Sequence, residues 1–338
     1  MKAVRFHQHG GPEVLKYEEA PDPDSERGHA IVRVRACALN HLDIWERQGL
    51  PRVTFPLPHT SGSDVAGEVV EADGFAAGQR VMLQPGLSCG HCPACVSGRD
   101  NLCHSYDVLG YMSTGGYAEY VKVPIANLIP IPDHIPYPEA AAFPLTFLTA
   151  WHMLMTVAAL RPGETVLVLA AGSGVGQAAV QIARYAGARV LATAGSDAKI
   201  ARAKEIGADE AINHTAGPFA GEVKRLTGGR GVDVVVEHVG EVTWAQSVRC
   251  LAQGGRVVTC GATTGAAAAL DLRHLFARQL SLLGSYMGRK GELLEASQLF
   301  FSGRLGPVVD TRFPLPEAAA AQHRVERREH FGKVVLEA

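Results

Sequence analysis

The clearest hydrophobic pattern in the chain lies between Thr165 and Gly187. Four consecutive apolar residues at 166–169 have the length and β-branching of a short strand that is buried on both faces, as in a parallel sheet. A turn of small residues follows at 170–176, and the apolar positions after it repeat at helical spacing until Gly187, a residue type that often ends a helix. The segment therefore predicts a strand, a tight turn and a helix.

The same alternation continues toward the C-terminus. A second apolar strand at 189–194 and a helix-like stretch that ends at Gly207 complete a βαβ unit. The predicted strands of this region lie at 166–169, 190–193, 210–213, 232–237, 256–260 and 280–285. Six strands that alternate with helices indicate an α/β fold, a doubly wound parallel sheet of the Rossmann type.

The first part of the chain has a different pattern. Short β-like runs lie at 30–36, 65–71, 80–83 and 117–123. Gly and Pro separate these runs densely, which is typical of an irregular antiparallel β domain or barrel.

Prolines recur between residues 124 and 138, and we expect the crossover between two domains there. An apolar helix is predicted next, at 138–157. The tail contains a predicted helix at 291–302 and a last strand at 333–336 that returns to the first domain. The predicted domains are thus residues 1–123 with 286–338, and residues 124–285.

Composition places the chain among ordinary globular proteins. It has 338 residues, 47% hydrophobic and 20% charged, with 32 Lys+Arg against 34 Asp+Glu. This balance gives no strong field, so we expect a small-molecule substrate and neither nucleic acid nor a charged membrane as partner. The N-terminus lacks an apolar core with a cleavage site, and no long uninterrupted apolar run occurs. We therefore expect a cytoplasmic protein.

Four of the seven cysteines crowd into one loop, which favours a metal over disulfides. They are Cys89, Cys92, Cys95 and Cys103. Four thiolates at this spacing can close a tetrahedral zinc site that leaves no position for substrate, so the zinc would be structural. An iron-sulfur cluster is the alternative, but its fourth cysteine normally follows after three residues, and here it follows after seven. His91 is expected to be exposed.

The small-residue turn is a candidate phosphate site, because glycines allow close approach and the N-terminus of the following helix favours an anion. Its candidate contacts are Gly172, Ser173, Gly174, Val175 and Gly176. The spelling is imperfect, since two glycines of the G-x-G-x-x-G template fall on Ala171 and Ser173. A glycine-rich turn without a ligand is the alternative.

With both motifs in hand, the chain resembles the medium-chain dehydrogenase/reductase superfamily, which includes zinc alcohol dehydrogenases and quinone oxidoreductases. The shared segments are GGPEVL, NHLDIW, GSDVAGEV, the four-cysteine lobe, GGYAEY, FPLTFLTAW, the glycine turn and FGKVVL. The resemblance implies a GroES-like irregular β-barrel domain that carries the catalytic residues and the zinc lobe at 89–103, beside a Rossmann domain. It also implies a homodimer or homotetramer in which the edge strand at 280–285 pairs across subunits.

The chain departs from the alcohol dehydrogenases of this family at their catalytic zinc. The first ligand position, a Cys in those enzymes, is Asn40, and the family's Gly-His-Glu is replaced by residues 62–64, Gly-Ser-Asp. The third ligand falls near Leu145 or Thr146, where there is no sulfur. The positions that relay the alcohol proton are Leu42 and Trp45.

Without that zinc, the alkoxide of an alcohol lacks its stabilising charge. Hydride delivery from NADPH to a quinone or an α,β-unsaturated carbonyl is favoured instead, because the substrate's own carbonyl accepts the developing charge. Asn40 and Tyr111 are the candidate hydrogen-bond donors to that oxygen, and Thr149 is a further candidate catalytic residue. A turn-capping role is the alternative for Asn40.

Two other functions stay open. One is a zinc alcohol dehydrogenase that uses unrecognised ligands, for which His41, Asp43, His59 and Asp64 are candidates. The other is a nucleotide-binding protein without turnover.

The end of the second predicted strand favours NADP(H) over NAD(H). Ala194 occupies the position where NAD-selective folds place an acidic residue, and Ser196 with Lys199 can bind a 2′-phosphate. Asp197 argues against this, or caps the next helix. His214 stands where related quinone reductases often have a Tyr near the adenosine phosphate. The remaining candidate cofactor contacts are Asn40, His41, Thr149, Val239, Gly261 and Lys333, with Arg256 as an alternative phosphate contact.

Overall fold

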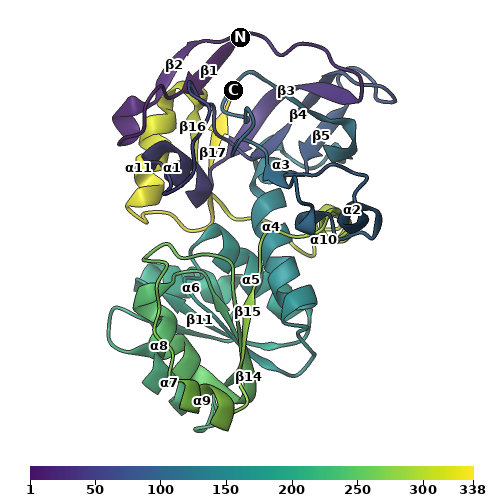
Figure 1. Ribbon diagram of the computed structural model, residues 1–338. Coiled ribbons are helices and arrows are strands. Elements are labelled where there is room, and N and C mark those ends of the chain that lie inside the picture. Colours follow the sequence, from purple (N-terminus) through teal and green to yellow (C-terminus); the bar gives the residue numbers. More distant parts are fainter. The chain divides into compact units, whose positions relative to one another are not determined.

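A computed structural model describes all 338 residues of the chain (Figure 1). They form two units. The first unit is Met1–Leu145 together with Arg289–Ala338, and the second unit is Thr146–Gly288.

The first crossover lies later than residue 124, where the sequence prediction placed it. Strand β9 (Leu128–Pro130) pairs with β5 (Arg80–Leu83), and helix α3 (Tyr137–Ala142) packs against strands of the same unit. The proline-rich segment therefore belongs to the first unit, and the chain leaves that unit only after Leu145.

A seven-stranded sheet forms the core of the first unit, in the order β16-β17-β3-β4-β5-β9, with β8 paired to β3. Its remaining strands are β3 (His29–Ala38), β4 (Asp64–Glu71), β8 (Tyr120–Pro124), β16 (Val309–Pro314) and β17 (Lys333–Glu337). Two small antiparallel pairs are β1 (Lys2–Arg5) with β2 (Lys16–Glu19), and β6 (Gly86–Leu87) with β7 (Asp107–Val108). The expected irregular β domain of the GroES-like type is confirmed.

Burial along β3 follows the period of a strand that faces a core on one side. Ala30, Val32 and Val34 are buried, while Arg33 between them is exposed. The apolar side chains of β3, β4, β5, β8 and β17 form one hydrophobic cluster. The tail returns to this sheet through β17, which pairs antiparallel with β3.

The helices of the first unit lie around the sheet. They are α1 (His41–Gln48), α2 (Pro93–Val96), α3, α10 (Lys290–Phe301) and α11 (Ala318–Glu326), with short 3-10 turns at Pro12–Val14, Asp100–Leu102, Ile125–Asn127 and Leu315–Glu317. Arg47 of α1 is fully buried and donates hydrogen bonds to Gln322 and Glu326 of α11. These hydrogen bonds join α1, in the N-terminal segment of the first unit, to α11, in its C-terminal segment.

The second unit is a parallel six-stranded sheet, as predicted, and its strand order is β12-β11-β10-β13-β14-β15. The strands are β10 (Thr165–Val168), β11 (Arg189–Ala194), β12 (Glu210–Asn213), β13 (Val232–Glu237), β14 (Leu251–Thr259) and β15 (Ser281–Gly284). The strand order reverses between β10 and β13. In sheets of this type, ligands bind at the carboxyl ends of the strands at such a reversal.

Helices connect these strands. They are α5 (Gly174–Tyr185), α6 (Asp197–Glu205), α7 (Phe219–Leu226), α8 (Glu241–Cys250) and α9 (Leu272–Ala277). Helix α5 packs on β10 and β11, whereas α7 and α8 pack on each other and α8 covers β13 and β14 (Figure 1).

The apolar helix predicted at 138–157 is divided. Helix α3 ends before Phe143, α4 (Pro144–Trp151) begins at a proline, and a π-helix covers His152–Val157. Proline lacks an N–H and restricts the residue before it, which separates α3 from α4. The whole segment is long and apolar enough to span a membrane, but 78% of its most apolar window is buried inside the protein, as in a core helix.

Candidate cofactor, zinc and catalytic sites

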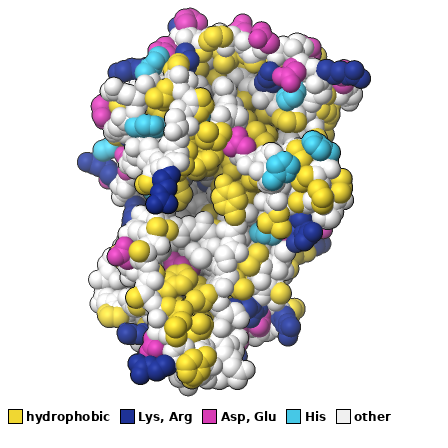
Figure 2. Space-filling model, viewed as in Figure 1, with side chains coloured by type: hydrophobic (Ala, Val, Ile, Leu, Met, Phe, Trp, Pro, Cys, Tyr) yellow, Lys and Arg dark blue, Asp and Glu magenta, His cyan; other side chains and the backbone are white.

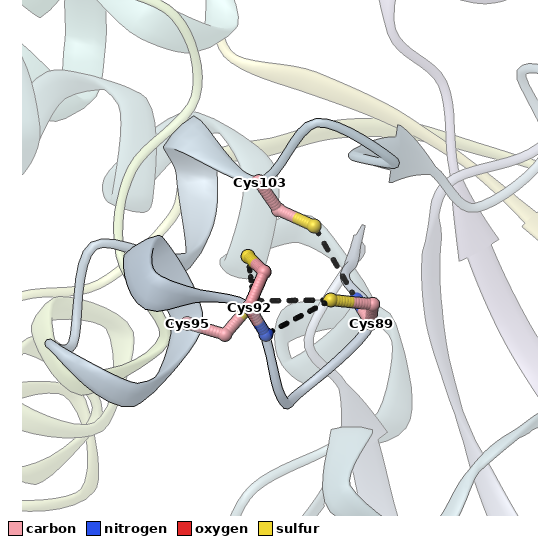
Figure 3. A group of neighbouring side chains, drawn as sticks. All are labelled: Cys89, Cys92, Cys95 and Cys103. Carbon is pink, nitrogen blue, oxygen red and sulfur yellow. Dashed lines mark hydrogen bonds between the residues drawn. The ribbon is translucent and has the colours of Figure 1, made fainter.

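The structure brings the four loop cysteines together (Figure 3). Their sulfur atoms lie within 4.8 Å of one another, and Cys95 Sγ is 3.5 Å from Cys92 Sγ and 3.9 Å from Cys89 Sγ. A tetrahedral zinc with Zn–S bonds of about 2.3 Å requires sulfur atoms about 3.8 Å apart. The cluster therefore fits a zinc ion with four protein ligands and no open position.

Backbone N–H groups of the loop point at the sulfur atoms. Cys92 N lies 3.4 Å from Cys89 Sγ, and Cys89 N lies 3.5 Å from Cys103 Sγ. The N–H groups of His91 and Cys92 lower the pKa of Cys89 to about 6, whereas burial raises the pKa of Cys95 to about 11. The loop thus favours a thiolate at Cys89 even before a metal supplies its charge.

His91 is not a member of the sulfur cluster. Its ring is exposed and Nδ1 is 2.7 Å from the Cys89 carbonyl oxygen. The expectation that His91 is exposed is confirmed.

Asp100 connects the cysteine lobe to the rest of the first unit. Its buried carboxylate accepts hydrogen bonds from the backbone N–H of Lys290 at 3.0 and 3.2 Å. Lys290 is the first residue of α10, where an acidic group also interacts favourably with the helix dipole.

The turn between β10 and α5 has the geometry of an anion site. Ser173 is the N-cap of α5 and its Oγ accepts from Gly176 N at 2.8 Å, while the N–H groups of Gly174 and Val175 make no hydrogen bond within the chain. A Cβ on Gly176 would lie 2.2 Å from the Ala170 oxygen, so only glycine allows this close approach of helix and strand. The first turn of α5 can therefore bind the pyrophosphate of a dinucleotide.

His238 also lies at this turn and was missed in the sequence. It follows β13 directly, is 8% exposed, and its Nε2 is 2.9 Å from the Leu169 carbonyl oxygen and 3.4 Å from Ser173 Oγ. Burial lowers the pKa of His238, so its ring is neutral at pH 7. Its place after a strand at the reversal of the sheet order was the signal that could have identified it.

The residues proposed to choose the cofactor meet at the carboxyl ends of β11 and β12. Ser196 is the N-cap of α6 and accepts from Lys199 N at 3.3 Å. A Cβ on Gly195 would lie 3.3 Å from the His214 ring. Asp197 is exposed, and its Oδ1 accepts a hydrogen bond from Asn213 Nδ2 at 3.0 Å. Neutral Ala194 ends β11, as the sequence placed it.

Three further candidates lie in the second unit. Val239 and Gly261 follow β13 and β14 at the same edge of the sheet. Thr149 of α4 is 5% exposed and its Oγ1 has no hydrogen-bond partner, so this buried hydroxyl can accept or donate to a ligand.

Arg256 does not fit a phosphate contact. Its guanidinium forms a bidentate pair with Glu164 at 2.7 and 2.9 Å, beside the start of β10. This is the edge of the sheet opposite the glycine turn.

Asn40 is part of a buried polar cluster in the first unit. It is the N-cap of α1 and is 7% exposed. Its Oδ1 lies 2.6 Å from Lys333 Nζ and its Nδ2 lies 2.9 Å from Asp64 Oδ2. Lys333 and Asp64 form a salt bridge at 2.9 Å and are 2% and 0% exposed. Lys333 therefore has two partners in the first unit, a role that the sequence did not suggest.

Asp43 and Glu46 form a second buried group on α1. Asp43 Oδ2 accepts from Asn40 N and from Tyr117 Oη, both at 2.8 Å. Burial raises the pKa of both carboxyl groups to about 8, and the neighbouring Glu46 raises that of Asp43 further. His59 lies beside them, 3.8 Å from Glu46 Oε2, and burial lowers its pKa.

Tyr111 and His41 lie nearer the surface. The Tyr111 ring packs edge-on against Phe55 at 5.3 Å, and burial raises the pKa of the Tyr111 hydroxyl. His41, the first residue of α1, packs edge-on against Trp45 at 5.0 Å.

The alternative metal site suggested by the sequence does not assemble. His41, Asp43, His59 and Asp64 do not bring ligand atoms together, and the four cysteines are the only such group in the chain. The positions that hold a catalytic zinc in the family also do not fit one. Asn40, Ser63 and Leu145 offer neither thiolate nor imidazole, and the Lys333 ammonium already lies beside Asp64.

Comparisons with known proteins identify the family of the chain. Residues 26–133 match the family of alcohol dehydrogenase GroES-like domains, and residues 174–302 match the family of zinc-binding dehydrogenases. Human quinone oxidoreductase is 30% identical over 337 residues, which cover 96% of this chain and 94% of that protein. A crotonyl-CoA carboxylase/reductase from Cereibacter sphaeroides is 29% identical, with 97% of this chain and 84% of that protein covered.

A solved structure described as an NAD-dependent alcohol dehydrogenase superposes over the full length of both chains. It has a TM-score of 0.97 and 48% sequence identity. The fold, the cysteine lobe and these full-length similarities lead to one assignment. The chain belongs to the medium-chain dehydrogenase/reductase superfamily of oxidoreductases.

Proposed function

We propose that this protein reduces quinones or α,β-unsaturated carbonyl compounds with NADPH and uses zinc only to hold its cysteine lobe. One observation carries the proposal. Where relatives with a catalytic zinc need a Lewis acid, this chain has the amide of Asn40, joined to a buried ammonium and a buried carboxylate. An amide can donate a hydrogen bond to a carbonyl oxygen, but it does not bind Zn²⁺ as a thiolate does.

The chemistry of a conjugated carbonyl suits such a donor. When bound, the reduced nicotinamide supplies a hydride. As hydride adds to the β-carbon, the π electrons move onto the carbonyl oxygen, and the α-carbon then takes a proton from water. A hydrogen bond from Asn40 stabilises the negative charge that develops on this oxygen in the transition state, and such stabilisation is usually the largest single contribution to catalysis. Two relatives, human quinone oxidoreductase and a crotonyl-CoA carboxylase/reductase, are named for substrates of these two classes.

Two features support a dinucleotide in the second unit. The first turn of α5 offers unpaired N–H groups, and Thr149 has a buried hydroxyl without a partner. Ser196, Lys199 and His214 would hold the 2′-phosphate of NADP(H), because no carboxylate replaces Ala194 to repel it.

Ala194→Asp is expected to reverse the cofactor preference. A carboxylate at the end of β11 repels the 2′-phosphate and accepts a hydrogen bond from the ribose 2′-hydroxyl of NADH. NADPH affinity should fall by about tenfold or more, since one unit charge next to a phosphate is worth roughly 1.4 kcal/mol or more here. Fluorescence titration with each cofactor measures the change. Ala77→Asp, which adds the same charge to an exposed loop of the first unit, should leave both affinities unaltered, and an unchanged ratio in A194D would refute the NADPH assignment.

A specific observation favours a second function. The solved structure with 48% identity is described as an NAD-dependent alcohol dehydrogenase. A panel assay separates the two functions: NADPH and NADH are each tested with quinones and small enones, and NADP⁺ and NAD⁺ with alcohols. The proposal requires turnover with a quinone or an enone. Turnover with alcohols alone supports the dehydrogenase, and binding of a cofactor without any turnover supports a nucleotide-binding protein.

We further propose a cytoplasmic homodimer or homotetramer. None of the seven cysteines forms a disulfide, which agrees with a reducing compartment.

The second sheet offers an edge for association. Strand β15 has only β14 as neighbour and is therefore an edge strand that can pair with a second copy. Figure 2 shows hydrophobic side chains gathered on the visible face of the second unit. The exposed apolar residues of this unit include Val242, Leu272, Phe276 and Tyr286. Sedimentation measures the state, and a monomer at micromolar concentration would contradict it.

A further inference from the structure

Lys333, Asp64 and Asn40 are brought together by the register of three neighbouring strands. Lys333 begins β17 and Asp64 begins β4, and both strands flank β3. Ala38, the last residue of β3, is opposite Asp64 on one side and Val335 on the other, and Asn40 follows two residues later. The positions of all three residues are therefore fixed by the central sheet of the first unit.

The partners of the Asn40 amide determine its orientation. Its Oδ1 faces an ammonium group, which can only donate, and its Nδ2 faces a carboxylate, which as an anion can only accept. A flipped amide would place donor against donor and acceptor against acceptor. Asp64 is fixed in turn, because its other oxygen accepts from Leu145 N at 2.8 Å.

This arrangement leaves one hydrogen of the Asn40 amide without a partner in the cluster. Nδ2 carries two hydrogens and donates one to Asp64. Lys333 and Asp64 are nearly fully buried, whereas Asn40 is the most exposed of the three, at 7%. Asn40 is thus the member that can reach a ligand.

We propose that Lys333 is a positioning residue that orients and polarises Asn40 as the hydrogen-bond donor to the substrate carbonyl oxygen. The inference rests on the proposed function above. An ammonium 2.6 Å from the amide oxygen draws electron density toward it, which makes the remaining N–H a stronger donor. Asp64 balances the charge, so the cluster stays buried without a net charge. No proton or electron leaves the cluster during the reaction.

Three variants of Lys333 separate charge from packing. Lys333→Met removes the charge and both hydrogen bonds, Lys333→Gln keeps donors without charge, and Lys333→Arg keeps the charge. Lys290→Met is the matched control, because Lys290 Nζ also donates to an asparagine of the first unit, Asn127, at 3.3 Å, and this pair shares no hydrogen bond with Asn40, Asp64 or Lys333. Each variant is compared with the wild type in steady-state NADPH oxidation with an aryl enone.

The inference predicts a loss in kcat rather than in KM. Removing a whole oxyanion donor costs about 100- to 1,000-fold in kcat, so weakening one should cost about 10- to 100-fold in K333M and K333Q. K333R should retain most of the activity, and KM and NADPH affinity should change little because the ground state gains little from the donor. K290M should behave as the wild type.

A series of aryl enones with different ring substituents supplies a second measurement, the slope of rate against substituent. A smaller fraction of folded enzyme lowers every rate equally and leaves this slope unchanged. Electron-poor rings stabilise the negative oxygen themselves, so the rate should depend more steeply on the ring substituent in K333M or K333Q than in the wild type. If K333M does not fold, K333Q and K333R carry the comparison. Equal kcat values and equal slopes in K333Q, K333R and K290M overturn the inference while the proposed function stands. No reduction of any enone or quinone by the wild type overturns both.

Discussion

Replacing Cys103 with Ser should remove the zinc from the lobe and unfold residues 89–103. Cys103 supplies one of the four sulfur atoms that lie within 4.8 Å of one another. Its Sγ also accepts hydrogen bonds from the backbone N–H groups of Cys89 and Ser105. In zinc-finger peptides a structural zinc contributes roughly 10–16 kcal/mol of binding free energy, and Cys103→Ser replaces one of the four thiolates with a hydroxyl, a much weaker zinc ligand. The loss should exceed that of any single substitution in this lobe that leaves all four cysteines in place.

Zinc content measures this prediction directly. We expect about one zinc per chain in the wild type and little in C103S, with faster proteolysis inside the lobe. Cys260→Ser, at the end of β14 in the second unit, is the control and should retain the zinc. A C103S protein that keeps a full zinc and resists protease would show that the lobe does not depend on the metal.

The second large effect is a loss of stability at alkaline pH. Burial raises the pKa of Glu46 and of Asp43 to about 8, far above their values in an unfolded chain. Between about pH 4 and pH 8 the folded state therefore holds protons that the unfolded state has released, so the free energy of unfolding falls as pH rises. The stabilisation is complete below the unfolded pKa and is lost as pH passes through 8.

Glu46→Gln should remove much of this pH dependence, because an amide of the same shape carries no charge. Each group contributes about 1.4 kcal/mol per pH unit, so Glu46 alone accounts for roughly 2–3 kcal/mol between pH 6 and pH 9. Urea unfolding at both pH values measures it, with exposed Glu205→Gln as control. Wild-type protein that is equally stable at pH 6 and pH 9 would contradict the prediction, as would an E46Q variant with the wild-type pH dependence.

Sequence could predict those parts of the protein that depend on short segments. The cysteine spacing and the strand-turn-helix around Gly176 involve residues close in the chain, and the structure places them as predicted. The parallel sheet was also predictable, because strands buried on both faces have continuous apolar runs. Strand β16 was missed since its residues, VDTRFP, alternate weakly and include charged side chains.

Contacts between distant segments could not be predicted in this way. Lys333 lies 293 residues from Asn40 and 269 from Asp64, and no local pattern marks their pairing. As the sequence offered no partner for this lysine, a phosphate contact was the natural hypothesis. The break between α3 and α4 is a different case, because Pro144 was visible but a proline inside an apolar run can bend a helix as well as divide it.

The relation between bound zinc and enone reduction tests the central claim most directly. Zinc is removed stepwise from the purified protein and added back, and NADPH-dependent reduction of an enone is measured against zinc per chain. We predict full activity at about one zinc per chain, with no gain from a second equivalent. Activity that requires about two zinc ions per chain, and that falls in proportion to the second, would contradict a reductase whose only zinc is structural.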